Sequence, residues 1–334
     1  AAHSSVTFET YLFRDGRVAE RFVSAFVERA MAGVPVKVLL DAQGSYGVAG
    51  ATLARLHAAG VEVRFFRRFD WRRPIGYNHR THRKILVVDG RVALTGGIGV
   101  ADMWAGPPAW CELGLRVDGP AAALLQGAFF QDWSLAGGAL DLGPACFPAF
   151  PAGQAGPLAM VTTSVPAWGD SMVGLLFLAA IAAAERRLTL VSPYFLPGRA
   201  MAGALADAAG RGVAVRLLLP GPHNDNPLAY HASRRLCAPL LACGVEVWEY
   251  GPAMMHAKAL AVDGTWASVG SANFDPRSIF LNSELNVSVD DPGLARAVEA
   301  FADAAIAVSR SVRPADLARD RWPGRLLGGL GLAL

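Results

Sequence analysis

The stretches His82-Arg-Lys-Ile-Leu-Val-Val-Asp-Gly90 and His256-Ala-Lys-Ala-Leu-Ala-Val-Asp-Gly264 decide how this chain folds. In a β-strand, residues two apart share a face, so each histidine and the lysine two residues after it point the same way. Asp-Gly between apolar runs predicts a tight hairpin turn. The second stretch begins 174 residues after the first, which indicates that one structural unit occurs twice in the chain.

Three further pairs of segments repeat in the same order. They are Phe8–Phe13 with Thr189–Phe195, Gly33–Leu40 with Gly212–Leu219, and Ala59–Arg64 with Cys243–Trp248. Between them, short apolar strands alternate with helical stretches, which predicts an α/β fold. We expect two halves, residues 1–155 and 156–334, each a mixed sheet flanked by helices. A pseudo-twofold axis should relate them, with the two hairpins meeting at the interface.

The composition favours an apolar partner over a nucleic acid. Hydrophobic residues make up 53% of the 334 residues and charged residues only 18%. The net charge of +3 is a small basic excess for a dedicated nucleic-acid binder, so no nucleic-acid partner is expected. No stretch reaches the ~18 to 20 apolar residues of a membrane-spanning helix. The four cysteines lack metal-ligand spacing and indicate thiols of a reducing compartment.

Each predicted hairpin returns to a glycine fourteen residues after its histidine. The first copy has Gly96-Gly97 there and the second has Gly270-Ser271. Binding and attacking a phosphate requires a nucleophile, fixed positive charge and close approach of the backbone, which only small residues permit. This unit offers all three, twice.

The pattern HxKxxxxD followed by Gly-Gly or Gly-Ser resembles the signature of the phospholipase D superfamily, and both copies are complete. The second copy continues as Gly270–Ser278 and Asn282-Ser-Glu284, close to the extended motif of that family. Further segments are most similar to bacterial cardiolipin synthases: Glu9–Phe13, Asp41 with Gly44-Ser45, Arg80–Lys84 and Pro193–Phe195. The resemblance covers nearly the whole chain. It departs at Gly99, where the family usually has an asparagine and the second copy has Asn273.

The resemblance implies a two-step reaction without a metal or a cofactor. One histidine attacks the lipid phosphorus and forms a phosphohistidine, while the other protonates the departing alcohol and then deprotonates the incoming one. We assign His82 as the nucleophile and His256 as the acid and base. The near symmetry of the two copies leaves the reverse assignment open.

The resemblance also implies roles for the residues around the histidines. Lys84 and Lys258 would neutralise the phosphate oxygens. The residues expected to contact the phosphate or substrate are Gly97, Ser271 and Asn273. Glu112, 30 residues after His82, and Glu284, 28 residues after His256, would each hold the second ring nitrogen of a histidine.

Asp89 and Asp263 complete the catalytic signature of the family. Each begins an Asp-Gly turn seven residues after its histidine. The turn favours a structural role in the hairpin over contact with phosphate.

Two segments predict contact with a membrane. Arg64–Arg73 interleaves five arginines with four aromatic residues, a pattern that suits anionic lipid headgroups. Its alternative is a strand with an amphipathic loop. The apolar end, Arg321–Leu334, would lie on a bilayer, pack on the core or fray. We expect a peripheral membrane protein, on the cytoplasmic side, whose substrate is a phospholipid such as phosphatidylglycerol.

Four functions fit these features to different degrees. The leading hypothesis is cardiolipin synthesis, in which a phosphatidyl group moves to the hydroxyl of phosphatidylglycerol. Hydrolysis of the phospholipase D type differs only in whether water reaches the intermediate, and the sequence does not separate the two. A nuclease of the superfamily would need a basic groove. An inactive lipid-binding homologue is disfavoured because both histidine-lysine pairs are intact.

Overall fold

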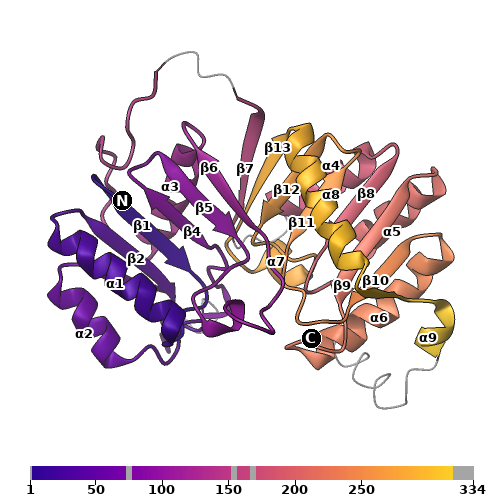
Figure 1. Cartoon of the computed structure of the whole chain (residues 1–334), viewed down its shortest axis with the longest axis horizontal. Helices are drawn as coiled ribbons and strands as arrows, with labels where there is room; N and C mark the ends of the chain where they lie inside the picture. Colours follow the sequence, from indigo (N-terminus) through magenta and orange to yellow (C-terminus); the bar gives the residue numbers. More distant parts are fainter. Residues whose placement is uncertain (1, 73–76, 152–155, 166–170, 319–334) are drawn as a thin grey trace.

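The computed structural model describes residues 2–72, 77–151, 156–165 and 171–318, and two β-sheets lie side by side in it (Figure 1). The strands of the first sheet are β1 (Val6–Thr10), β2 (Val36–Asp41), β3 (Glu62–Phe66), β4 (Ile85–Val88), β5 (Val92–Gly96) and β6 (Gly114–Asp118). Their order is β3-β2-β1-β4-β5-β6. The helices of this half are α1 (Arg17–Met31), α2 (Gly50–Ala58), a 3-10 turn (Asp102–Trp104) and α3 (Ala122–Leu135).

The second sheet has the order β14-β10-β9-β8-β11-β12-β13-β7. Its strands are β7 (Leu158–Ser164), β8 (Arg187–Val191), β9 (Ala214–Pro220), β10 (Glu246–Tyr250), β11 (Ala259–Val262), β12 (Trp266–Gly270), β13 (Glu284–Asp290) and β14 (Ser309–Ser311). The helices of this half are α4 (Met172–Ala183), α5 (Arg199–Gly210), α6 (Pro227–Ala242), α7 (Pro276–Phe280), α8 (Pro292–Ile306) and α9 (Pro314–Ala318).

The six central strands of the second sheet repeat the first sheet in order and direction. β1 pairs parallel with β2 and antiparallel with β4, and β8 pairs in the same way with β9 and β11. The predicted α/β repeat, with mixed sheets flanked by helices, is therefore confirmed. The predicted boundary near residue 155 and the apolar end, 321–334, lie outside the described residues. The boundary stays a prediction.

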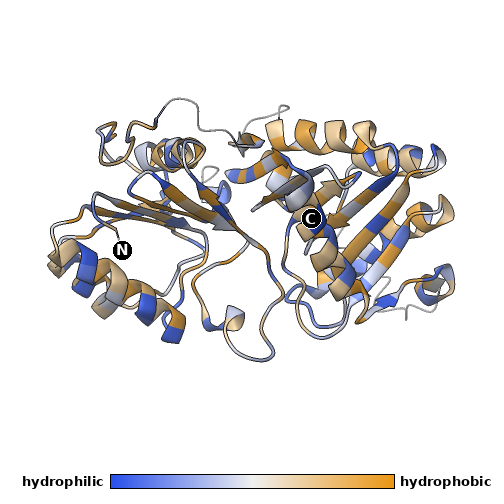
Figure 2. Cartoon of the chain, turned by 45° about the horizontal axis from the view of Figure 1, so that its top comes forward, coloured by the Kyte–Doolittle hydropathy of each residue, from blue (hydrophilic) through white to orange (hydrophobic). Residues whose placement is uncertain are grey.

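Helices cover both faces of each sheet. Apolar side chains of α1 and α2 pack on one face of the first sheet and those of α3 on the other. The second sheet has α4, α5 and α6 on one face and α8 on the other. Figure 2 shows the strands between these layers coloured largely as hydrophobic. A further core joins the halves, because Ile85 and Val87 of β4 pack in one cluster with Leu285 and Val287 of β13.

Asp89 and Asp263 form the hairpin turns that the sequence predicts. Both have a positive φ, 55° and 54°, and each is followed by a glycine with positive φ. The Asp89 carboxylate accepts hydrogen bonds from three successive backbone N–H groups that lead into β1, and Asp263 accepts three that lead into β8. Seven residues of extended chain separate each aspartate from its histidine, about 23 Å. These contacts are structural, and the structure does not bring either aspartate to the histidines.

We predict that Asp263→Ala lowers the free energy of unfolding by about 1 to 3 kcal/mol, since three backbone donors lose their acceptor. Asp263→Asn keeps an acceptor oxygen and tolerates positive φ, so its loss should be smaller. Urea unfolding of both variants measures the difference. A large loss of catalytic rate in Asp263→Ala with an unchanged unfolding midpoint would contradict the structural role.

Candidate active site

Backbone hydrogen bonds cross between the halves beside both histidines. The N–H of His82 donates to the carbonyl of Ser283 at 2.8 Å, and the N–H of His256 donates to the carbonyl of Cys111 at 2.7 Å. Ser283 and Cys111 each stand directly before a glutamate of the predicted site. The backbone of each half therefore fixes a histidine of one repeat next to the glutamate of the other.

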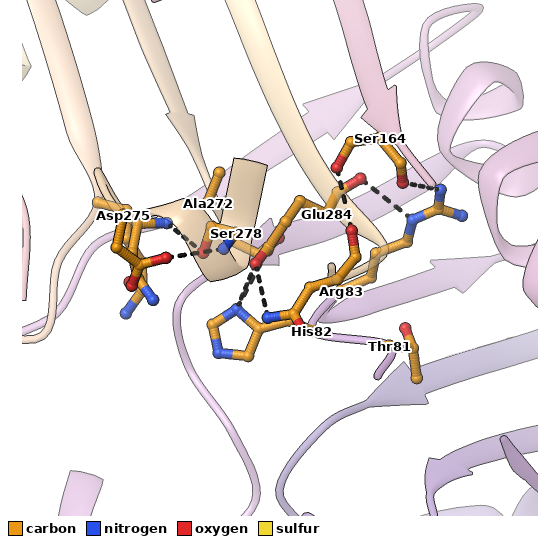
Figure 3. A network of polar contacts seen from close by, with 12 residues as sticks. Thr81, His82, Arg83, Ser164, Ala272, Asp275, Ser278 and Glu284 are labelled. Atoms are coloured by element: carbon orange, nitrogen blue, oxygen red, sulfur yellow. Dashed lines mark hydrogen bonds and ion pairs between the residues drawn. The ribbon is translucent and has the colours of Figure 1, made fainter. Parts of the chain in front are cut away.

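The two histidine-glutamate pairs are crossed in the same sense. His82 Nδ1 lies 2.9 Å from Glu284 Oε1 (Figure 3), and His256 Nδ1 lies 2.5 Å from Glu112 Oε2. The sequence does not say which glutamate belongs to which histidine, and the structure gives each histidine the glutamate of the other half. Since a carboxylate holds Nδ1 in both rings, Nε2 is the nitrogen that faces no carboxylate, and Nε2 of His256 lies 3.2 Å from Lys258 Nζ.

Arg83 lies between the histidine and the lysine of the first motif, and its side chain points away from theirs. It joins the two halves by hydrogen bonds. It is fully buried and donates to the carbonyls of Glu284 at 3.2 Å and Ser164 at 3.1 Å (Figure 3). It also donates to the carbonyl of Ala128 at 2.8 Å. Asp132 lies 3.5 Å from its guanidinium and balances the charge. A buried charge needs such partners. Arg83 therefore links α3 of the first half, through Ala128, to Ser164 and Glu284 of the second half.

Both motif lysines are buried beside their histidines. Lys84 Nζ donates to the carbonyl of His82 at 2.7 Å, while Lys258 Nζ lies 2.8 Å from His256 Nδ1 and 3.8 Å from Glu112 Oε2. Burial lowers the pKa of Lys84 to about 7, helped by the charge of Lys258, and burial lowers the pKa of Lys258 to about 8. Two buried cationic groups, one of which lowers the pKa of the other, favour an anion beside them.

The histidines are neutral at pH 7. Burial lowers the pKa of His82 to about 4, although the charge of Glu284 opposes the shift. Burial, followed by the charges of Lys258, Lys84 and His82, lowers the pKa of His256 well below its usual range. The four groups of the two motifs thus act on one another electrostatically across the interface, as the sequence predicts for a shared site.

The two glutamates differ in protonation. Burial alone would raise the pKa of Glu284, but the charge of His82 and hydrogen bonds from His82 and Ser271 hold it below its usual value. The Ser271 hydroxyl donates to Glu284 Oε2 at 2.5 Å. In the first copy Gly97 takes the place of this serine, and burial raises the pKa of Glu112 to about 7. One serine-to-glycine difference therefore accompanies an ionised carboxylate in one pair and a titrating one in the other.

The residues expected to contact phosphate fall into two groups. Gly97 packs against Glu112, because an added Cβ would lie 2.3 Å from Glu112 Oε2. Ser271 has its hydroxyl proton on Glu284. Each of these two residues therefore contacts a glutamate of the site. Asn273 is buried, and its Oδ1, which can only accept, has no hydrogen-bond partner among the described residues, so this oxygen is open to a donor.

Aromatic rings that the sequence analysis did not single out surround both histidines. Trp104 and Trp110 lie against His256 with ring centroids 5.6 Å and 5.1 Å away, and Tyr11 lies 5.3 Å from His82. A Cβ added to Gly99 would lie 3.0 Å from the Trp104 ring, so the departure from asparagine at Gly99 makes room for Trp104.

We predict that Glu284→Gln lowers the pKa of His82 further, because the ionised carboxylate is what raises it against burial. Glu112→Gln should change the pKa of His256 less, because Glu112 is protonated over the acidic range in which His256 titrates. Titration of ¹⁵N-labelled histidines by NMR measures both shifts. Equal shifts in the two variants would show that the glutamates carry the same charge.

The sequence matches the family described as "Cardiolipin synthase, PLD-like domain" over residues 1–133 and 177–305. Cardiolipin synthase A of Pseudomonas syringae pv. syringae (strain B728a) is 36% identical over 93% of this chain, and that of Pseudomonas aeruginosa (strain LESB58) is 36% identical over 99%. The chain spans 65% of the length of the first relative and 67% of the second.

Two solved structures share the fold at low sequence identity. The phosphatidylserine synthase of Haemophilus influenzae Rd KW20 aligns with a TM-score of 0.73 at 16% identity, covering 98% of this chain and 87% of that one. The polyphosphate kinase of Porphyromonas gingivalis aligns with a TM-score of 0.61 at 13% identity, covering 100% of this chain and 50% of that one. Taken with the family match and the crossed histidine pairs, these likenesses place the chain in the cardiolipin synthase family of phospholipase D-like proteins.

Proposed function

We propose that this chain carries the catalytic centre of a cardiolipin synthase, which moves a phosphatidyl group onto the hydroxyl of phosphatidylglycerol. The observation that carries the proposal is the meeting of two histidine-glutamate pairs and two buried lysines at one interface. That set supplies a nucleophile, an acid and base, and positive charge for a phosphodiester. Relatives that match almost the whole chain are named cardiolipin synthase A.

In the first proposed step, His82 Nε2 attacks the phosphorus of the donor lipid. A P–N bond forms and the P–O bond to the departing glycerol breaks, while His256 gives that oxygen its Nε2 proton and takes the proton of protonated Glu112 at Nδ1. The positive charge that develops on the His82 ring is stabilised by Glu284, which is ionised and 2.9 Å away. An ionised partner on His82 and not on His256 supports His82 as the nucleophile.

In the second proposed step, the hydroxyl of phosphatidylglycerol gives its proton to His256 and attacks the phosphorus, and the P–N bond to His82 breaks. His256 must hold a proton at the end of this step and release it in the next cycle. Glu112 has a pKa of about 7 and lies 2.5 Å from His256 Nδ1, so this pair can take up or release one proton near neutrality.

We propose that Lys84, Lys258 and Asn273 hold the phosphate in both steps. Both lysines are buried and cationic or titrating near neutrality, and an anionic phosphodiester would favour their charged forms. Asn273 is buried at the end of the second motif, and its Nδ2 group would donate to a phosphate oxygen. Gly97 and Ser271 would act through the glutamates.

Phosphatidylglycerol vesicles test the proposal. We expect cardiolipin and glycerol in equal amounts by mass spectrometry, with turnover at least about 10³-fold lower in His82→Ala and in His256→Ala. Phosphatidic acid in place of cardiolipin would make the chain a hydrolase. A donor lipid with a p-nitrophenol leaving group separates the histidines, since that group departs without an acid. His256→Ala should then still form the covalent intermediate, and the opposite result would make His256 the nucleophile.

We further propose that the chain works at a membrane surface, on the cytoplasmic side. Phe69 and Trp71 are 66% and 75% exposed, and Arg72 lies over the Trp71 ring at 5.2 Å. Aromatic rings next to arginines suit the headgroup region of an anionic bilayer. All four cysteines are free thiols, which suits a reducing compartment. Within the part of the chain that the structure describes, no helix has the length and apolarity needed to cross a membrane.

We predict that Phe69→Ser with Trp71→Ser weakens binding to phosphatidylglycerol vesicles by about tenfold or more, because two rings lose their apolar burial. Leu142→Ser is the matched control. Leu142 is 69% exposed but lies near Asp141, whose carboxylate is 3.6 Å from Lys37 at the opposite end of the sheet from Phe69. Co-sedimentation measures binding. Equal losses in the double variant and in the control would place the docking surface elsewhere.

A further inference from the structure

An apolar groove of about 530 Å³ lies between α1 and the central strands β1 and β4 of the first sheet. Its apolar lining includes Ala2, Val6, Phe22, Ala25, Leu86 and Val88. Leu86 and Val88 of β4 are only partly buried, although they sit in the middle of a sheet. Arg21, Glu28 and Arg29 stand at its rim. The groove is separate from the histidine site and takes no part in the proposed reaction.

The second half has a helix where the first half has this groove. Val6 pairs with Val88 across β1 and β4, and Leu188 pairs with Val262 across β8 and β11, so these two pairs are equivalent positions of the repeat. Leu188 and Val262 are buried, at 0% and 7% exposure, in one cluster with residues of α4. The residues of α4 in that cluster are Val173, Phe177, Ala180 and Ile181.

The chain enters both halves by the same turn. Asp89 binds the N–H groups of residues 3–5, and Asp263 binds those of residues 185–187, which join α4 to β8. Residue 2 is therefore equivalent to Ala184, the residue directly after α4. Ala184 is 2% exposed, and Ala2 is 6% exposed and lines the groove. The turn that leads into β1 is thus equivalent to the turn that joins α4 to β8.

We propose that this groove is the docking site of an apolar α-helix with the character of α4, joined to the amino end of β1. The equivalence with α4 predicts where this helix lies and in which direction it runs. The partly buried Leu86 and Val88 predict that its face toward the groove is apolar. The chain spans 65% of the length of the Pseudomonas syringae protein, so that relative has residues beyond the aligned part. Docking would complete the first half as α4 completes the second.

A grafted helix tests the proposal. Residues 171–184, which bring their own cap at Ser171, would be placed directly before His3 in the full chain. We expect the thermal midpoint to rise by about 5 °C and the fluorescence of a bound apolar dye to fall at least about twofold. A second graft, with aspartate at the positions of Phe177 and Ile181, should produce neither change, because the helix would have lost the side chains that fill the groove.

Point variants keep the test independent of the graft's own folding. Ala25 is exposed on α1 and lines the groove, so Ala25→Arg should cancel the rise in midpoint and lower dye binding by the ungrafted chain. Met31→Arg adds the same charge to α1 at a 77% exposed site outside the groove and should do neither. The proposal is overturned if the first graft changes neither readout, or if Ala25→Arg dissociates a dimer of the ungrafted chain, which would make a second copy the occupant.

Discussion

Two imidazole-carboxylate contacts that cross between the repeats are the constraint on which the rest of the structure depends. Glu284 is 0% exposed, and its partner His82 comes from the other half, 202 residues away. Removing the partner of a buried charge costs about 3 to 5 kcal/mol, so the halves favour the one register that satisfies both pairs. The backbone bridges beside each histidine and the buried Arg83 hold the same register. Neither half has a complete site by itself.

The same docking concentrates charge out of water. The ammonium groups of Lys84 and Lys258 are both buried. Exclusion of water is the main reason why the pKa of each lysine is lowered. Since a phosphate between them would return both to their charged forms, substrate binding and lysine protonation are coupled by the architecture. The fold thus stores an unfavourable electrostatic arrangement that an anionic ligand relieves, which fits the active site of a phosphoryl-transfer enzyme.

The sequence predicted what depends on local pattern and missed what depends on docking. The alternation of the two HxK strands and their Asp-Gly turns predicted both hairpins, and four repeated segments predicted two equivalent sheets. The partners Glu112 and Glu284 could not be assigned, because spacing along one chain does not show how two sheets meet. The wall formed by Trp104 and Trp110 was missed for the same reason. Asp89 and Asp263 belong to the signature, yet their contacts explain them as turn residues.

The departures from symmetry are small and fall where the two histidines need different surroundings. At the position after the first motif glycine, the second half has Ser271, which donates to Glu284, and the first half has Gly97, which leaves Glu112 without that donor. A repeat with identical copies would place a carboxylate of the same pKa beside each histidine, and the two histidines would then not differ in their surroundings. The charge of His82, with hydrogen bonds from His82 and Ser271, holds the pKa of Glu284 below its usual value, whereas burial raises the pKa of Glu112 to about 7. The duplication therefore supplies the geometry, and the differences between its copies supply the difference in protonation that the proposed division between a nucleophile and an acid would use.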